Sequence, residues 1–206
     1  METAIADLLR AYERRSEQEW ALMEKLGEGG TSASIDDFLL SVGPRTGQFL
    51  NSMVRDAKAR RVLEIGTSYG YSTVWLAEAV RATGGILTTI EIHAKKQAHA
   101  RAQLTAVGLA GCVVFQLGDA LKILAALAGP FDLVLLDLWK DLYRPCFDLF
   151  LPKLAPGAYV IADNMLEPPV VRPQAEAYQR HVRESGRFDT LLLPIGSGLE
   201  VSRLVK

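Results

Sequence analysis

The sequence predicts an α/β fold built on a mostly parallel sheet of seven strands, with helices on both faces. Two observations predict it. From Arg61 to Ala162, short apolar runs alternate with segments of helical length, and this alternation is typical of parallel strands joined by helices. The last two apolar runs are joined only by residues 194–198, too few for a parallel crossover, so the chain should end in an antiparallel hairpin.

The composition is that of one globular domain. The 206 residues are 49% hydrophobic and 23% charged, which is enough to bury a core on both faces of a sheet. We expect residues 1–58 to form a helical N-terminal segment and residues 59–206 to form the core of the same domain. The net charge of −1 gives no attraction to nucleic acid or to an anionic membrane, so the expected partner is a small molecule.

We expect no targeting segment and no cysteine site. Charged residues begin at Glu2, and no run of about 18 apolar residues is present to span a bilayer. The expected location is therefore cytoplasmic. Cys112 and Cys146 lack the close spacing of a zinc or redox site, so both should be reduced thiols in the core.

The N-terminal segment should contain three helices. The first spans residues 2–26 and either packs on its own domain or forms a lid or a dimer contact. Its apolar residues recur at helical spacing, and they are Ile5, Leu8, Leu9, Tyr12, Trp20, Met23 and Leu26. A second helix should begin near Ser34 and stop at Gly43-Pro44, because the residue before a proline disfavours helical geometry. A third helix should take residues 46–57.

Strands and helices then alternate through the core, and right-handed crossovers between parallel strands fix most of the topology. The expected parallel strands are residues 61–65, 86–92, 112–117, 131–136 and 158–162, and the hairpin strands are 188–193 and 199–205. The expected helices are residues 72–80, 95–107, 120–127, 142–154 and 174–184.

Oxygen-bearing side chains follow two of these strands. Asp137 follows the strand 131–136, and Asp163 and Asn164 follow the strand 158–162. Ligands bind at the carboxyl ends of strands in open α/β sheets, and neighbouring strands lie about 4.8 Å apart, so these side chains can meet. Two carboxylates and an amide suit Mg²⁺, Ca²⁺ or Mn²⁺ rather than zinc. The alternative for Asp163-Asn164 is a cap or a turn.

A second ligand site is expected at the ends of the first three strands. Residues 66–70, Gly-Thr-Ser-Tyr-Gly, join the first strand to its helix, where glycine allows close approach and the helix offers unpaired N–H groups. Glu91 ends the second strand and can accept both ribose hydroxyls of an adenosine ligand; the alternative is a solvated strand-end glutamate. Asp119 follows the third strand and can accept from an adenine amino group, cap the next helix, or do both.

These motifs resemble the series found in class I S-adenosylmethionine-dependent methyltransferases. The likeness lies in Val62–Ser72 and in the two following strand ends, Glu91 and Gly118-Asp-Ala120. It implies a Rossmann-like fold and a donor site for S-adenosylmethionine. The donor-site residues that it implies are Glu64, Gly66, Tyr69, Gly70, Ser72, Glu91, Asp119, Ala120 and Asp137.

Further motifs are similar to those of cation-dependent O-methyltransferases. Gly47-Gln-Phe-Leu50 resembles the sequence before the first strand in the caffeoyl-CoA group. Asp137-Leu-Trp-Lys-Asp-Leu-Tyr143 resembles the Asp-His-Trp-Lys-Asp-Arg-Tyr of catechol O-methyltransferase, and Asp163-Asn164 completes the set. The resemblance implies a divalent cation, Mg²⁺ before Ca²⁺ or Mn²⁺, on Asp137, Asp163 and Asn164.

Lys140 is the expected general base. It lies one turn beyond Asp137, where a neighbouring cation would disfavour protonated lysine, and the resemblance implies the same role. The alternative is a surface lysine paired with Asp141. Two features differ from the catechol enzyme: Leu138 replaces a histidine, and residues 190–202 offer no convincing match to the carboxylate that holds the second catechol hydroxyl, since Glu200 is a poor candidate.

The sequence therefore predicts a metal-dependent O-methyltransferase that acts on a small, aromatic vicinal diol. A nicotinamide-dependent oxidoreductase is the first alternative, but Ser68 and Tyr71 occupy positions where the dinucleotide fingerprint has glycine. A non-catalytic protein with a methyltransferase-like fold is the second. By analogy with enzymes of this type, we expect a homodimer.

Overall fold

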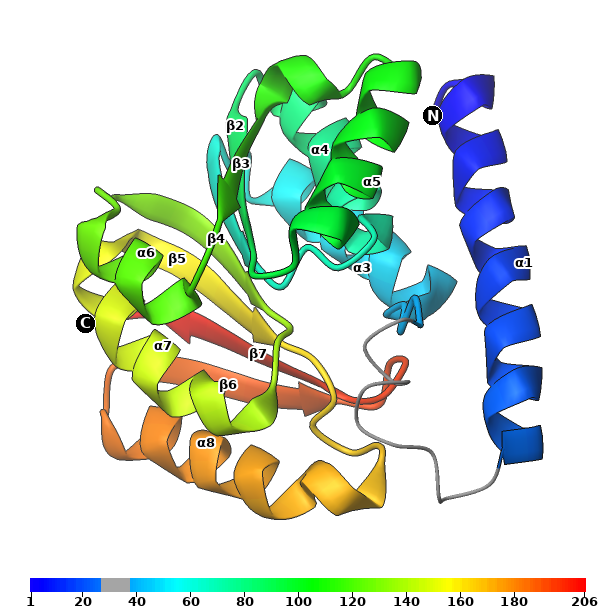
Figure 1. Cartoon of the computed structure of the whole chain (residues 1–206). Helices are drawn as coiled ribbons and strands as arrows, with labels where there is room; N and C mark the ends of the chain where they lie inside the picture. Colours follow the sequence, from blue (N-terminus) through cyan, green and yellow to red (C-terminus); the bar gives the residue numbers. More distant parts are fainter. Residues whose placement is uncertain (27–37) are drawn as a thin grey trace.

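The computed structural model describes residues 1–26 and 38–206, and the side chains of residues 1–22 and 38–206. A seven-stranded sheet runs through the centre of the molecule in the order β3-β2-β1-β4-β5-β7-β6 (Figure 1). The strands are β1 Arg61–Ile65, β2 Ile86–Glu91, β3 Val113–Leu117, β4 Phe131–Leu136, β5 Leu154–Ala162, β6 Phe188–Leu193 and β7 Leu199–Leu204. Strands β1 to β5 pair in parallel, and β7 is antiparallel to both of its neighbours. The predicted fold class is confirmed.

The strand order places the point of reversal at the middle of the sheet. From β1 the chain moves outward through β2 and β3, and then returns to place β4 on the other side of β1. Crevices at such a reversal are where open α/β sheets bind ligands, at the carboxyl ends of the strands. The central strands read as near-continuous apolar runs because helices cover both of their faces.

The helices form two layers (Figure 1). On one face lie α1 Thr3–Leu26, α3 Gly43–Asp56, α4 Tyr71–Thr83 and α5 Ala94–Ala106, and on the other lie α6 Ala120–Ala126, α7 Tyr143–Phe150 and α8 Arg172–Glu184. Short 3₁₀ turns occupy Ala110–Cys112, Lys140–Leu142, Leu151–Lys153 and Pro169–Val171. Among the described residues, no helix is long and apolar enough to cross a membrane.

Helix α1 packs on its own chain through its first half. Ile5, Leu9 and Tyr12 are buried in the core on the side of α4, and the Tyr12 hydroxyl donates to the Tyr69 carbonyl at 2.6 Å. The prediction that the apolar stripe resumes at Trp20 is wrong, because that side chain is 54% exposed. The side chains of Met23 and Leu26 lie outside the described part of the chain.

Three predicted boundaries are corrected by the structure. Gly43-Pro44 opens α3 instead of interrupting a helix, because a proline in the first turn lacks only an N–H group that would be unpaired there. The helix predicted to reach Leu154 ends at Phe150, and Leu154 already belongs to β5. Cys112 lies in a 3₁₀ turn before β3 and is only partly buried. The helix predicted to begin near Ser34 falls mostly outside the described residues.

Candidate active site

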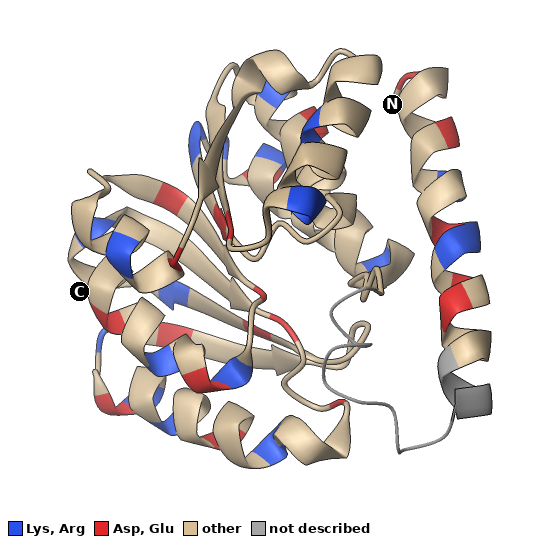
Figure 2. Cartoon of the chain, viewed as in Figure 1, with Lys and Arg blue, Asp and Glu red and all other residues tan. Residues whose placement is uncertain are grey.

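The carboxyl ends of β4 and β5 bring Asp137 and Asp163 together. Leu136 and Ala162 are partners in the parallel register, so the residue after each lies at the same edge of the sheet. The Asp163 N–H donates to the Leu136 carbonyl at 3.1 Å. This hydrogen bond keeps the two segments adjacent beyond the last residue pair of β4 and β5. Figure 2 shows acidic residues at the ends of the central strands and in the loops that follow them.

Asp163 is a buried carboxylate with an unsatisfied oxygen. Its side chain is 2% exposed, and its Oδ1 atom has no hydrogen-bond partner among the described residues. Burial first, and then the negative charge of Asp137, raise the pKa of Asp163 to about 7, although the positive charge of Lys140 and a backbone hydrogen bond from Asn164 act in the opposite direction. An unpaired buried carboxylate beside a second carboxylate is unfavourable alone, so this pair fits a bound cation.

Asn164 completes the set of oxygen donors. Its backbone is left-handed, with φ of 58°, a conformation that asparagine tolerates better than most residues. The side-chain amide nitrogen donates to the Glu167 carbonyl at 3.1 Å, which orients the amide and leaves its oxygen as an acceptor. Within the described part of the chain, no group of three or more His, Cys, Asp or Glu side chains gathers as a metal site. A cation here would rely on two carboxylates and this amide.

The loop that carries Asn164 is held by the β6–β7 turn. The N–H of Met165 donates to the Gly198 carbonyl at 3.0 Å, and the N–H of Leu166 donates to the Ser197 carbonyl at 2.9 Å. A side chain at Gly198 would lie 2.6 Å from Leu166. The C-terminal hairpin therefore fixes the segment after Asp163, a role that the sequence analysis did not assign to it.

Lys140 points toward the acidic pair. Its Nζ atom lies 3.4 Å from Asp137 Oδ1 and also donates to the Leu138 carbonyl at 3.1 Å. The Lys140 side chain is 11% exposed. Lys140 forms its ion pair with Asp137 and is largely buried, so the alternative of a surface lysine paired with Asp141 does not describe this geometry.

Tyr143 is a site residue that sequence reasoning missed. Its side chain is 0% exposed, its hydroxyl oxygen accepts a hydrogen bond from Lys140 Nζ at 2.6 Å, and its proton is donated to the Asp163 carbonyl at 3.1 Å. Burial, followed by the charges of Asp137 and Asp163, raises the pKa of Tyr143 well above its usual range, so it stays protonated. The signal was its place three residues after Lys140.

The turn between β1 and α4 approaches the same edge. Gly66 has φ of 109°, and a β-carbon there would lie 2.0 Å from the Asp137 carbonyl oxygen. Gly70 caps α4 in a left-handed conformation, and a β-carbon would lie 2.8 Å from Ala100. Both predicted glycines are therefore required by backbone conformation and close approach. Because of Gly66, the turn lies directly against the residue that begins the acidic pair.

Glu64 supports this turn from inside. It is 0% exposed and accepts hydrogen bonds from the hydroxyls of Ser72 at 2.6 Å, Thr73 at 2.7 Å and Thr89 at 2.6 Å. Burial raises the pKa of Glu64 to about 7, although the three hydroxyls lower it. Glu64 and Ser72, both predicted to bind the donor, are hydrogen-bonded to each other, and their contact with a donor stays a prediction.

Glu91, the residue predicted to bind the ribose, lies at the end of the next strand and holds the turn that follows β1. The Glu91 carboxylate accepts from the Ser68 N–H at 2.7 Å and from the His93 N–H at 2.8 Å, one on each oxygen. Ribose hydroxyls would have to use its remaining lone pairs. Asp119 caps α6 by accepting from the Lys122 N–H at 2.9 Å, as one of its two predicted roles requires, and Ala120 opens the helix.

Tyr69 lies beneath helix α1. The Arg15 guanidinium sits 4.1 Å from the centre of the Tyr69 ring, Lys96 lies 5.5 Å from the same point, and the His99 ring meets it edge-on at 5.4 Å. Cationic groups over a ring face are attracted by its quadrupole. Helix α1 thus contributes Arg15 to the surroundings of Tyr69, a residue predicted to bind the methyl donor. The apolar pattern of the helix alone did not indicate this contact.

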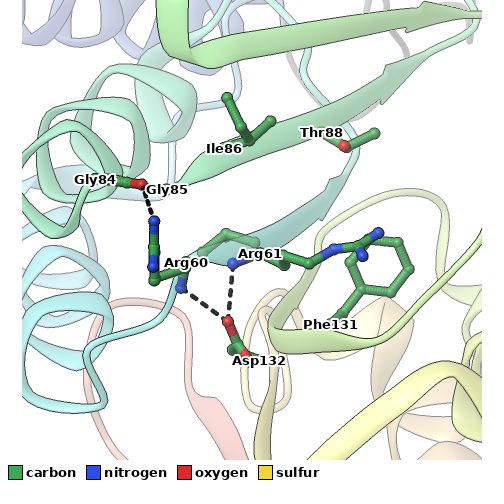
Figure 3. Close-up of a pocket in the computed structure, with 9 residues that line it drawn as sticks. Arg60, Arg61, Gly84, Gly85, Ile86, Thr88, Phe131 and Asp132 are labelled. Carbon is green, nitrogen blue, oxygen red and sulfur yellow. Dashed lines mark hydrogen bonds between the residues drawn. The ribbon is translucent and has the colours of Figure 1, made fainter.

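A separate pocket of about 560 Å³ lies at the opposite, amino end of the strands, between Arg60, Arg61 and Asp132 (Figure 3). Asp132 Oδ2 accepts from the backbone N–H groups of both arginines at 2.8 Å. The Arg60 guanidinium donates to the Gly84 carbonyl, whereas that of Arg61 turns toward Phe131. The two cationic groups diverge, so we assign no chemistry to this pocket.

Comparison with known proteins agrees with the geometry. The family profile described as O-methyltransferase matches residues 13–205. A catechol O-methyltransferase from Niastella koreensis is 33% identical over 176 residues, covering 84% of this chain and 76% of the relative. Another, from Mycobacterium tuberculosis, is 37% identical over 128 residues, covering 62% of this chain and 58% of the relative.

A solved structure gives the same result at the level of the fold and sequence. The O-methyltransferase TomG from Streptomyces achromogenes, in complex with S-adenosylmethionine, superposes with a TM-score of 0.71 at 25% identity, covering 100% of this chain and 91% of that one. The chain therefore belongs to the O-methyltransferase family, and the prediction of a class I S-adenosylmethionine-dependent O-methyltransferase is confirmed.

Proposed function

We propose that this enzyme transfers a methyl group from S-adenosylmethionine to one hydroxyl of a small, aromatic vicinal diol. A divalent cation, Mg²⁺ before Ca²⁺ or Mn²⁺, is held by Asp137, Asp163 and Asn164, and Lys140 is the general base. The observation that carries the proposal is the buried Asp163 carboxylate with an unpaired oxygen beside Asp137. Catechol O-methyltransferases are among the relatives, which supports this choice of acceptor.

The donor set fits a hard cation. Asp137, Asp163 and Asn164 offer only oxygen, which suits Mg²⁺, Ca²⁺ or Mn²⁺. A bound divalent cation supplies Lewis acidity, which lowers the pKa of a ligating hydroxyl and fixes the position of two adjacent oxygens. Three protein ligands leave room for both oxygens of a vicinal diol, which supports a chelating acceptor of this class.

The rest of the chemistry belongs to the protein. Lys140 would take the hydroxyl proton at Nζ, while the freed oxygen attacks the methyl carbon and the carbon–sulfur bond breaks with its electrons going to sulfur. Such a displacement needs in-line alignment and no covalent enzyme intermediate, so positioning should dominate the rate gain. Gly66 allows the donor turn to approach Asp137 closely, and this contact supports the alignment.

Calorimetry and product analysis test the proposal. S-adenosylmethionine should bind the protein, and a panel of catechols with Mg²⁺ should yield monomethylated product that disappears in chelator. Asp137→Ala should abolish turnover, whereas the neighbouring exposed Asp141→Ala should not. Turnover that persists unchanged in chelator refutes the metal assignment, and the absence of donor binding refutes methyl transfer.

Two further properties stay predictions. We propose a homodimer, by analogy with enzymes of this type, and a cytoplasmic location. Light scattering at several protein concentrations decides the first, and a fluorescent fusion in the source cells decides the second.

A further inference from the structure

Tyr143 links the proposed base to the loop of the proposed cation site. It is the first residue of α7 and fully buried. Because its single proton is donated to the Asp163 carbonyl at 3.1 Å, the short 2.6 Å contact with Lys140 must be one in which the tyrosine oxygen accepts. The hydroxyl therefore has a fixed direction, with its lone pairs facing Lys140.

Tyr143 is also the nearest of the three acceptors around Lys140. The Leu138 carbonyl lies at 3.1 Å and Asp137 Oδ1 at 3.4 Å. Asp137 is the one that the proposed cation would share, so Tyr143 and Leu138 remain to hold the amine. A neutral amine has two N–H groups and one lone pair; once both N–H groups are donated, the direction of the lone pair is set.

We propose that Tyr143 is a positioning residue that aims the Lys140 amine at the acceptor hydroxyl and ties it to the segment carrying Asp163. This inference rests on the proposed function, in which Lys140 removes the hydroxyl proton. It adds a role for the last residue of the Asp137–Tyr143 motif, and it explains why a buried side chain contacts a lysine at all.

The competing explanation is that Tyr143 only fills the core. Its ring meets that of Tyr178 edge-on, with centroids 5.4 Å apart. Tyr178 is buried as deeply, yet its hydroxyl has no hydrogen-bond partner among the described residues. Tyr178→Phe is therefore a matched control, because it removes a buried hydroxyl from the same aromatic pair without touching Lys140.

Steady-state kinetics with two acceptors separate the explanations. For Tyr143→Phe, kcat with catechol should fall on the order of 10- to 100-fold, since a well-placed general base contributes about 10² to 10⁴, while KM for S-adenosylmethionine stays unchanged. With 4-nitrocatechol, whose hydroxyl is more acidic and depends less on a base, the loss should be under about threefold. Tyr178→Phe should match the wild type with both. Equal losses on the two acceptors, or no loss on either, overturn the inference.

A second background tests whether Tyr143 acts through Lys140. In Lys140→Met, adding Tyr143→Phe should cause no further loss of kcat with catechol, the acceptor on which Tyr143→Phe alone has its large effect, because the interaction is already gone. A further loss comparable to that in the wild-type background refutes positioning of the base.

A spectroscopic readout is independent of turnover. In the ligand-free protein labelled with ¹⁵N-lysine, the side-chain ammonium signal of Lys140, assigned as the one that Lys140→Met removes, should show slow proton exchange in the wild type and in Tyr178→Phe. In Tyr143→Phe the same signal should exchange fast, because its hydrogen bond is gone. If this holds but no catechol is methylated, the proposed function fails while the Lys140–Tyr143 contact stands. If Tyr143→Phe leaves the signal unchanged, the inference fails whatever the enzyme methylates.

Discussion

Replacing Glu64 by glutamine should make the folded protein more stable at alkaline pH. Glu64 is fully buried, and its pKa rises from 4.5 to about 7. Its three partners are hydroxyls, those of Ser72, Thr73 and Thr89, with no cation among them. Glutamine has nearly the same shape, and a hydroxyl can rotate to accept from an amide as well as donate to its oxygen.

The magnitude follows from linkage. A carboxyl whose pKa is higher in the folded protein than in the unfolded chain holds its proton more tightly when folded. Stability is therefore highest below about pH 4.5 and falls as the pH rises toward about 7. Each pKa unit is worth about 1.4 kcal/mol, so the full loss is roughly 3 kcal/mol. Glu64→Gln does not lose stability in this way, because glutamine does not titrate. Its free energy of unfolding is lowered only by the weaker hydrogen bonds of an amide, at every pH.

Urea unfolding of both proteins at pH 5 and pH 8 measures the effect. The wild type should lose roughly 2 to 3 kcal/mol relative to Glu64→Gln between these two pH values, with unchanged m-values. Other titrating groups cancel in the difference between the two proteins. A difference in unfolding free energy that does not change with pH would show that Glu64 titrates normally, and would refute the desolvation argument.

Three other changes have defined outcomes. Asp163→Asn should abolish stabilisation by Mg²⁺, which in the wild type should reach about 2.7 kcal/mol at a hundred times Kd; melting temperatures with and without Mg²⁺ check it. Lys140→Met should lower kcat about 100-fold with unchanged calorimetric affinity for S-adenosylmethionine. Gly66→Ala should lower the free energy of unfolding by more than about 3 kcal/mol, because backbone strain and a steric clash add. Gly84 has φ of 68° and open space around it, so Gly84→Ala should lower it by only about 1 kcal/mol. Urea unfolding compares the two variants.

The positions at the strand ends could be predicted from the sequence because each depends on a local pattern. An apolar run that ends in Asp137, or in Asp163-Asn164, marks a buried strand and its carboxyl edge without any knowledge of the neighbours. The turn of Gly66 was visible for the same reason. The boundary at Phe150 was not, because Pro152 and the apolar residues after it fit a helix end and a strand start equally well.

Direction and burial could not be predicted, because they depend on residues far along the chain. Glu64 was expected to face a ligand, yet it turns inward to Thr89, 25 residues away. The Oδ1 atom of Asp163 is buried without a hydrogen-bond partner among the described residues, and nothing in the residues next to Asp163 in the sequence indicates this. Tyr143 belongs to the site because its hydroxyl donates to the Asp163 carbonyl, 20 residues along the chain. A pattern of residue types carries none of this information.

The donor turn and the cation ligands are joined through backbone atoms. The Asp137 N–H donates to the Ile65 carbonyl at 2.9 Å, and the missing β-carbon of Gly66 leaves space for the Asp137 carbonyl. Methyl transfer depends on alignment to a fraction of an ångström, and backbone held in a sheet moves less than long side chains. Gly66→Ala should therefore weaken binding of both the donor and the cation, whereas Asp137→Asn, which keeps the backbone contact, should weaken cation binding more than donor binding; calorimetry with each ligand compares the two variants.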